Sequence, residues 1–227
     1  SYAGEKAAMW NIGDIGSWII SSVTDMSYMF SYAGKNAITW SVGDLSDWNT
    51  ASVTNMRGMF DYAGYSATTW NIGNLGDWNT TNVTNMSSMF DHAGYNATTW
   101  YIGDLSGWNT LSVTDMSWLF SYLGENAAIW DIGDISNWNT LNVTNMKGIF
   151  AGIPAVANIS ITNWNTSSVT NMASMFYGSE LSSSDLNNII LYLNTSNVTD
   201  MTGMLANNTK LEQLNVSSFD TTKALSI

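Results

Sequence analysis

The chain repeats itself every 30 residues, and this period limits its possible folds more than any other feature. Across residues 1–150 the same residue types return at the same place in five successive units, without an insertion. Two columns are tryptophan: Trp10, Trp40, Trp70, Trp100 and Trp130, and Trp18, Trp48, Trp78, Trp108 and Trp138. A unit this short cannot bury its own apolar side chains, whereas stacked copies share one core. The period therefore predicts a stack of similar coils.

After residue 150 the period becomes shorter but continues. The frame returns at Trp164, Leu193 and Phe219, and the only proline, Pro154, stands where the long units end. We predict one domain over 1–227 with about eight coils, of which 1–150 are regular 30-residue repeats and 151–227 are shorter, degenerate ones. Residues 1–9 match the tail of a unit and the last unit stops partway, so we expect a segment cut from a longer chain.

Each unit carries two apolar patterns. Trp40 and Val42 alternate with polar residues, which predicts a short parallel strand with one buried face. The second set has helical spacing and consists of Val53, Met56, Met59, Phe60 and Ala63. We expect Thr50 and Ser52 to cap this helix and Gly64 to end it. The expected class is an α/β repeat, a leucine-rich-repeat-like solenoid with one short parallel strand and one helix per coil of about 30 residues.

The tryptophan columns predict two ladders of stacked rings inside this solenoid. A buried aromatic side chain removes about 150–250 Å² from water, so each ring would add several kcal/mol to the core before entropy is counted. The methionine columns fall on the predicted helix and are interpreted as core packing rather than as a copper site. No cofactor is needed to explain the 12 tryptophans.

Composition excludes several classes of function. The chain is acidic, with 6 Lys and Arg against 18 Asp and Glu, a net charge of −12, no Cys and a single His. Nucleic acid and anionic lipid are therefore unlikely partners by charge, and thiolate chemistry is absent. No apolar run reaches the roughly 18 residues that a membrane span needs. No phosphate-binding loop, nucleophile elbow or zinc-protease motif occurs, so we expect no enzyme, no catalytic residues and no cofactor.

A column of acids follows the predicted strand. It contains Asp14, Asp44, Asp104 and Asp134, and Asn74 interrupts it. One interpretation is a carboxylate ladder that binds Ca²⁺. The other is a turn residue whose side chain accepts backbone N–H groups, a role that Asn74 also fills. The second is favoured, so we predict no metal site. The acids Asp25, Asp115 and Asp200 are interpreted as helix caps.

An aromatic column lies at the far end of the predicted helix. It holds Tyr2, Tyr32, Tyr62 and Tyr122, with His92 as the fourth of five members. The favoured interpretation is that the rings pack on the coil while the tyrosine hydroxyls contact water. A recognition stripe is the alternative. His92 is not expected to be a catalytic base, because its equivalents are tyrosines.

The stretch Trp78-Asn79-Thr80-Thr81-Asn82-Val83-Thr84-Asn85-Met86-Ser87-Ser88-Met89-Phe90 carries a resemblance. It is similar, at nearly every position, to the repeats of the BspA-like leucine-rich-repeat surface protein family, which read close to F-D-T-S-N-V-T-N-M-S-x-M-F. The resemblance extends over essentially the whole chain. It implies a leucine-rich-repeat-type solenoid at a bacterial cell surface, with roles in adhesion or recognition and no catalysis. Trp in place of Leu and the unusual repeat length depart from that family.

The positions that vary within the constant frame are the candidates for partner contact. On the outward side of the predicted strands they are Thr39, Ser41, Thr69, Asn71, Thr99, Tyr101, Ile129 and Asp131. We expect an extracellular or cell-surface module that binds a protein or a glycan through this face, with self-association possible and no membrane insertion. The alternative is a structural spacer, or a filament or appendage segment, because the repeats are nearly identical.

Overall fold

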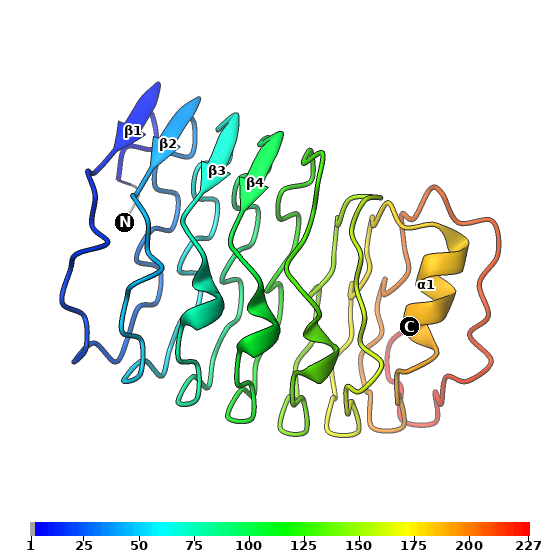
Figure 1. The fold of residues 1–227 in the computed structure, drawn as a ribbon. Helices are drawn as coiled ribbons and strands as arrows, with labels where there is room; N and C mark the ends of the chain where they lie inside the picture. The colour runs from blue at the N-terminus through cyan, green and yellow to red at the C-terminus, as the bar shows by residue number, and fades with distance from the viewer. Residues whose placement is uncertain (1–2) are drawn as a thin grey trace.

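A computed structural model describes residues 3–227. Each repeat forms one elongated coil, and successive coils lie side by side from the N-terminus to the C-terminus (Figure 1). Four short strands lie together along one edge: β1 (Met9–Asn11), β2 (Thr39–Ser41), β3 (Thr69–Asn71) and β4 (Thr99–Tyr101). β1 pairs with β2 and β3 with β4, both in parallel and with equivalent residues opposite each other. The molecule is therefore a tryptophan-rich repeat protein in which each repeat packs on its neighbours.

The predicted strands are confirmed in the first four coils, at the places where the alternating pattern put them. In β2, Trp40 points into the core while Thr39 is exposed. Short 3₁₀ turns follow the strand side in three coils: η1 (Leu75–Asp77), η2 (Leu105–Gly107) and η3 (Ile135–Asn137). Each turn buries its first residue, which explains why the apolar residue of the connection faces inward. The fifth repeat has no assigned strand around Trp130, although that ring remains buried.

The helix predicted in every coil is wrong. Within residues 3–227 the one α-helix is α1 (Ser183–Ile190), and the stretch from Val53 to Gly64 is a series of tight turns. Alternate N–H groups bond three residues back, as from Met59 to the Met56 carbonyl at 3.2 Å. From Met56 to Tyr62 the groups between them donate to the next coil, as from Phe60 to the Met89 carbonyl at 2.8 Å. An α-helix would have used all of these groups within one coil.

Backbone conformation explains this outcome. Gly58 and Tyr62 both have φ near +55°, the left-handed region, which an α-helix cannot contain. The apolar side chains of this stretch still point inward, and Val53, Met56 and Phe60 are fully buried. The spacing therefore correctly predicted which residues form the core, and it misassigned the backbone that places them there.

The predicted caps Thr50 and Ser52 instead tie coils together. The Thr50 hydroxyl donates to the Asn79 carbonyl of the next coil at 3.1 Å, and the Ser52 hydroxyl donates to the Ser21 carbonyl of the previous one at 2.7 Å. The threonine at the Thr50 position is buried in six successive coils and always donates forward. Because each buried hydroxyl donates to a backbone carbonyl of the next coil, the column satisfies its own buried polar groups and links the coils.

Both tryptophan ladders are present. In the first, the ring centroids of neighbouring residues from Trp10 to Trp130 lie 5.4–6.5 Å apart with nearly parallel planes. In the second, Trp48 stacks on Trp78 at 6.1 Å, and Trp138 on Trp164 at 6.3 Å. Within this ladder Trp18 is the exception, since half of its surface is exposed at the first coil. A third stack runs through the phenylalanines from Phe30 to Phe176.

Large side chains on one coil lie over glycines of the next. A Cβ atom added to Gly58 would come within 2.5 Å of the Tyr28 ring, and one added to Gly148 within 2.1 Å of the Trp118 ring. Tyr28 and Trp118 themselves have positive φ values. Where one coil carries an aromatic residue at this position, the next coil therefore carries a glycine. The ring leaves no room for a Cβ atom there, and the backbone of the glycine has a positive φ.

The shorter repeats continue the same pairing. Seven isolated parallel bridges connect one residue from each of eight coils, in the order Asp25, Asn55, Asn85, Asp115, Asn145, Asn171, Asp200 and Ser226. The bridge between Asn145 and Asn171 joins the coils on either side of the segment that contains Pro154. α1 replaces the strand side of one late coil, and its buried Leu186 and Ile190 join the common core.

Candidate functional site

The residues predicted to contact a partner lie on the strand-side edge of the stack. Seven of the eight are exposed and Ser41 is partly exposed. Tyr101 and Ile129 leave 48% and 75% of their surface open. The buried tryptophans between them hold the backbone in place. The face is therefore a rigid base with variable side chains.

Two hollows open on this edge between successive coils. One, of about 300 Å³, includes Ser41, Thr69 and Asn71 in its lining. The other, of about 280 Å³, includes Tyr101, Ile129 and Asp131, together with Asp104. Six of the eight predicted residues thus line the two hollows, whereas Thr39 and Thr99 lie outside both. The second hollow combines an aromatic ring, an aliphatic side chain and two carboxylates.

The acid column beside this edge forms turns. Asp14, Asp44, Asn74, Asp104 and Asp134 each accept a hydrogen bond from the N–H two residues later, at 2.9–3.0 Å. Hydrogen bonds from the side chain and backbone of Ser46 lower the pKa of Asp44. The backbone N–H of Ser136 lowers the pKa of Asp134. Asn74 makes the same turn without a charge, so backbone geometry accounts for the column.

The acids interpreted as helix caps have a related role. The Asp25 carboxylate accepts from the Ser27 N–H at 2.8 Å, and the Asp200 carboxylate accepts from the Thr202 N–H at 3.0 Å. Both residues belong to the line of parallel bridges, and no helix follows them. The asparagines from Asn49 to Asn165 also close local turns rather than forming an amide ladder between coils.

The aromatic column forms a continuous stack in the turns that precede the strands. Tyr32, Tyr62, His92 and Tyr122 follow one another at 4.9, 4.3 and 4.6 Å between ring centroids. Tyr2 lies outside the described residues. Because each ring face is covered by the next ring, the column presents ring edges to solvent. This geometry supports the packing interpretation over a recognition stripe, because a ligand that stacks on a ring needs an uncovered ring face.

A second row and a cation complete this aromatic surface. Tyr65 stacks on Tyr95 at 4.6 Å, beside the first row. The Lys35 ammonium lies 4.3 Å from the Tyr62 ring centroid and 4.7 Å from that of Tyr32, where a cation–π attraction operates. Burial raises the pKa of Tyr62 to about 12.

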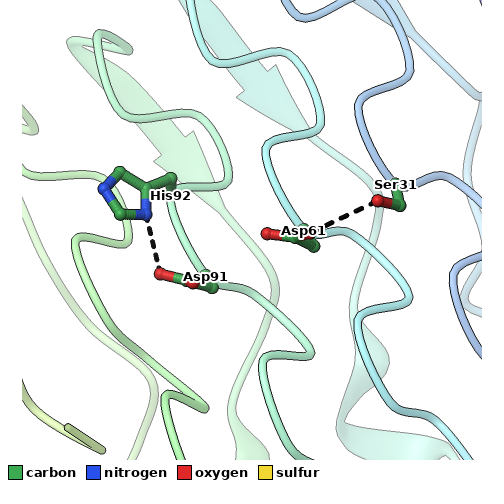
Figure 2. A network of polar contacts seen from close by, with 4 residues as sticks. All are labelled: Ser31, Asp61, Asp91 and His92. Atoms are coloured by element: carbon green, nitrogen blue, oxygen red, sulfur yellow. Dashed lines mark hydrogen bonds and ion pairs between the residues drawn. The ribbon is translucent and has the colours of Figure 1, made fainter. Parts of the chain in front are cut away.

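Two carboxylates lie beside the rings in adjacent coils. Figure 2 shows Asp61 accepting a hydrogen bond from the Ser31 hydroxyl, and Asp91 paired with His92. The distances are 3.3 Å for the first contact and 2.7 Å between His92 Nδ1 and Asp91 Oδ1. Burial, with a contribution from the nearby Asp91 charge, raises the pKa of Asp61 to about 6. The sequence interpretation did not find this pair, although acids at 61 and 91 replace serines at 31 and 121.

Among residues 3–227, no group of three or more His, Asp or Glu side chains has the geometry to hold a metal ion. The same residues contain no helix of the length and apolar character that crossing a bilayer requires.

The comparisons with known proteins identify a family. The family model described as "Mycoplasma protein of unknown function, DUF285" matches residues 1–123, 62–180 and 155–227, three overlapping stretches that together cover the chain. Searches of curated proteins and of solved structures gave no match. The overlap of the matches is what a repeat protein produces, because the model fits in several registers. The chain belongs to this family of repeat proteins.

Proposed function

We propose that the protein is a non-catalytic recognition module that binds a protein or a glycan through its strand-side edge. The observation that carries this proposal is the contrast between a constant core and a variable exposed row. Trp70 and Trp130 keep their place and burial in the coils where the outward residues change from Thr69 and Asn71 to Ile129 and Asp131. Rigid concave or ridged surfaces of stacked repeats are common binding platforms.

The finer fold assignment belongs to the same proposal. We interpret the stack as a solenoid related to the BspA-like leucine-rich-repeat proteins, in which turns replace the helix of each coil. The repeated V-T-x-M-x-x-M-F frame and the parallel pairing between coils support this interpretation. From the same resemblance we propose a place at the bacterial cell surface, where adhesion modules act.

The hollow beside Tyr101 is the place to test the proposal. The variant Tyr101→Ala with Ile129→Thr and Asp131→Asn removes its ring, aliphatic and charged groups. Leu111→Thr with Leu141→Thr is a matched control, because these side chains are comparably exposed and lie in turns away from the edge. Glycan arrays and immobilised surface-protein extracts would be probed with the purified chain and both variants.

Binding that the first variant loses and the control keeps supports recognition through this edge. Equal binding by all three proteins contradicts it. Binding by none of them favours the second candidate, a structural spacer. That candidate draws on one observation, the uninterrupted line of bridges from Asp25 to Ser226, which makes one stiff element of the whole chain.

A further inference from the structure

A hollow of about 260 Å³ lies beside α1, where this helix replaces the strand side of a late coil. The segment 157–162 of the preceding coil forms one wall, and residues of α1 and of the turn after it form the other. The following coil packs against α1 as well, since the Asn187 amide donates to the Gln213 carbonyl at 3.1 Å. The hollow therefore lies between neighbouring coils within the stack.

Several polar side chains of the lining are free to bind a ligand. Asn158, Ser160, Thr162 and Asn188 have no hydrogen-bond partner among the described residues. Asn187, next to Asn188 in the helix, shows the contrast, because its amide bonds both Gln213 and Asn215 of the next coil. Each free group can both donate and accept a hydrogen bond.

The position of Ser160 shows how this coil departs from the earlier ones. Trp164 N–H donates to the Ile161 carbonyl as Trp138 N–H does to the Ile135 carbonyl, so Ser160 holds the place of Asp134. In each of the five long coils, the residue at that place accepts from the N–H two residues later and is held in a turn. No described N–H donates to the Ser160 hydroxyl, which leaves it available in the hollow.

An aromatic ring and a single carboxylate complete the lining. Tyr192 leaves 44% of its surface open, and no other described ring stacks on it. The Asp185 carboxylate accepts from the Ser182 hydroxyl at 2.6 Å at the start of α1. Among the described residues that line the hollow there is no Lys, Arg or His. An anionic ligand would thus meet a carboxylate and no cation, which disfavours it.

A sugar ring meets these conditions. Its hydroxyls both donate and accept, as amides and hydroxyls of the lining do, and its apolar C–H face can pack on an aromatic ring. Pockets for drug-sized ligands have about 300–1,000 Å³, so this smaller hollow suits one ring with the rest of the chain outside. We propose that the hollow beside α1 binds one residue of an uncharged glycan. The site is separate from the hollow beside Tyr101, so the inference goes beyond the proposed function and can fail without it.

Two variants remove the two kinds of contact. Asn158→Ala with Asn188→Ala removes the free amides, and Tyr192→Ala removes the ring. Asn137→Ala with Asn163→Ala is the matched control, because these asparagines are exposed, have no described hydrogen-bond partner and lie outside the hollow. A melting curve checks that each variant folds. The probe is an array of neutral oligosaccharides that end in hexoses or N-acetylhexosamines, with matched chains that end in sialic or uronic acid.

We expect the unmodified chain and the control to bind the same neutral oligosaccharide, measured by calorimetry on the strongest array signal. Both hollow variants should bind it about tenfold or more weakly, the usual effect of losing such contacts. Binding to no neutral oligosaccharide, equal affinity of the hollow variants, or a preference for the acid-terminated chains overturns the proposal.

The variant Tyr101→Ala with Ile129→Thr and Asp131→Asn, measured in parallel, separates this proposal from the recognition function proposed above. Glycan binding that this variant loses and the hollow variants keep overturns the site beside α1 and leaves recognition through the strand-side edge standing. Glycan binding that only the hollow variants lose supports the site beside α1 and assigns no role to the hollow beside Tyr101.

Discussion

At the scale of single residues, the Asp61 carboxylate lies in surroundings that disfavour its charged form. It is partly buried, it lies near Asp91, and its pKa rises to about 6. The unfolded chain has the ordinary value near 3.8. Between these two values the folded protein binds more protons than the unfolded chain, so stability falls as pH rises from about 4 to about 6. Above that window the loss is complete and constant.

We therefore expect Asp61→Asn to stabilise the protein at pH 8 and to change little at pH 4. The amide keeps an acceptor for the Ser31 hydroxyl and removes the charge. After allowance for solvent screening of this partly exposed group, the gain is about 1–2 kcal/mol. Urea unfolding at both pH values measures it, with the exposed Asp47→Asn as control. A gain of equal size at pH 4 would show that the charge is not its cause.

A second prediction at this scale concerns the buried threonine column. Thr110→Val leaves the Asn139 carbonyl without the hydroxyl that donates to it at 3.0 Å. Loss of an intramolecular hydrogen bond of this kind costs about 0.5–1.5 kcal/mol. Thr114→Val is the control, because its hydroxyl bond is exposed and the same Thr84 carbonyl keeps the Thr114 N–H. Chemical denaturation should separate the two, and equal losses would mean that water reaches both carbonyls.

At the scale of the element, the turn series between Val53 and Gly64 depends on backbone that only a few residues tolerate. Gly64 has φ of +55°, and a Cβ there would lie 2.9 Å from atoms of both the Trp40 and the Trp70 rings. Gly13 has φ of +84° with no atom within 4 Å of its added Cβ. The two glycines thus separate the conformational cost from the steric one.

We expect Gly13→Ala to cost about 1–2 kcal/mol, the usual penalty of the left-handed region. Gly64→Ala should cost more than that, by about 1–3 kcal/mol, because two packed rings must shift. Thermal unfolding of both variants measures the difference. Similar losses of stability would mean that the Trp40 and Trp70 rings shift at little cost to make room for the added methyl group.

The same element shows how far sequence reasoning reaches. Apolar spacing correctly identified Met56, Phe60 and Ala63 as core residues, because burial is a property of side chains and is written in the sequence directly. The hydrogen-bond partners were missed, because an N–H that bonds a neighbouring coil leaves no mark on that spacing. One local signal was available. Gly58, with Gly148 and Gly203 at equivalent places, interrupts a stretch that a helix would fill with better helix formers.

The strand-side edge shows a similar division. Alternation predicted that Tyr101 and Asp131 face outward, and they do. The hollows between coils could not be predicted, because they depend on how closely neighbouring turns approach. The raised pKa of Asp61 was equally out of reach, since it depends first on how deeply the folded coils bury the carboxyl and then on Asp91 in another coil.

At the scale of the whole molecule, the hydrophobic core is continuous from the first coils to the last. The buried cluster extends from Trp10 to Met204, and both the Trp138–Trp164 stack and the Asn145–Asn171 bridge pass the segment around Pro154. We expect one cooperative unfolding transition for residues 1–227. Limited proteolysis that released two stable halves, cut between 151 and 160, would contradict a single domain.

Trp70→Ala tests how strongly that unit depends on its ladder. Trp70 is fully buried between Trp40 and Trp100, so truncation should cost about 3–5 kcal/mol and lower the midpoint of the single transition. Trp18→Ala, at the half-exposed end of the second ladder, should cost clearly less. Calorimetry measures both, and an unchanged Trp70→Ala midpoint would place that ring outside the core.

The aromatic rings that lie over glycines of the next coil also bear on how such a chain can change in evolution. Coils of equal length recombine easily at the level of the gene, and deletion of one unit in frame keeps the backbone pairing. The deletion does, however, change which coils lie next to each other. Loss of residues 39–68 would bring Tyr28 over Ser88, where Gly58 now leaves room for its ring. The Trp118 ring likewise needs a glycine at the place of Gly148 in the next coil. The coils share one design and still have a fixed order, which unequal crossing-over cannot shuffle freely.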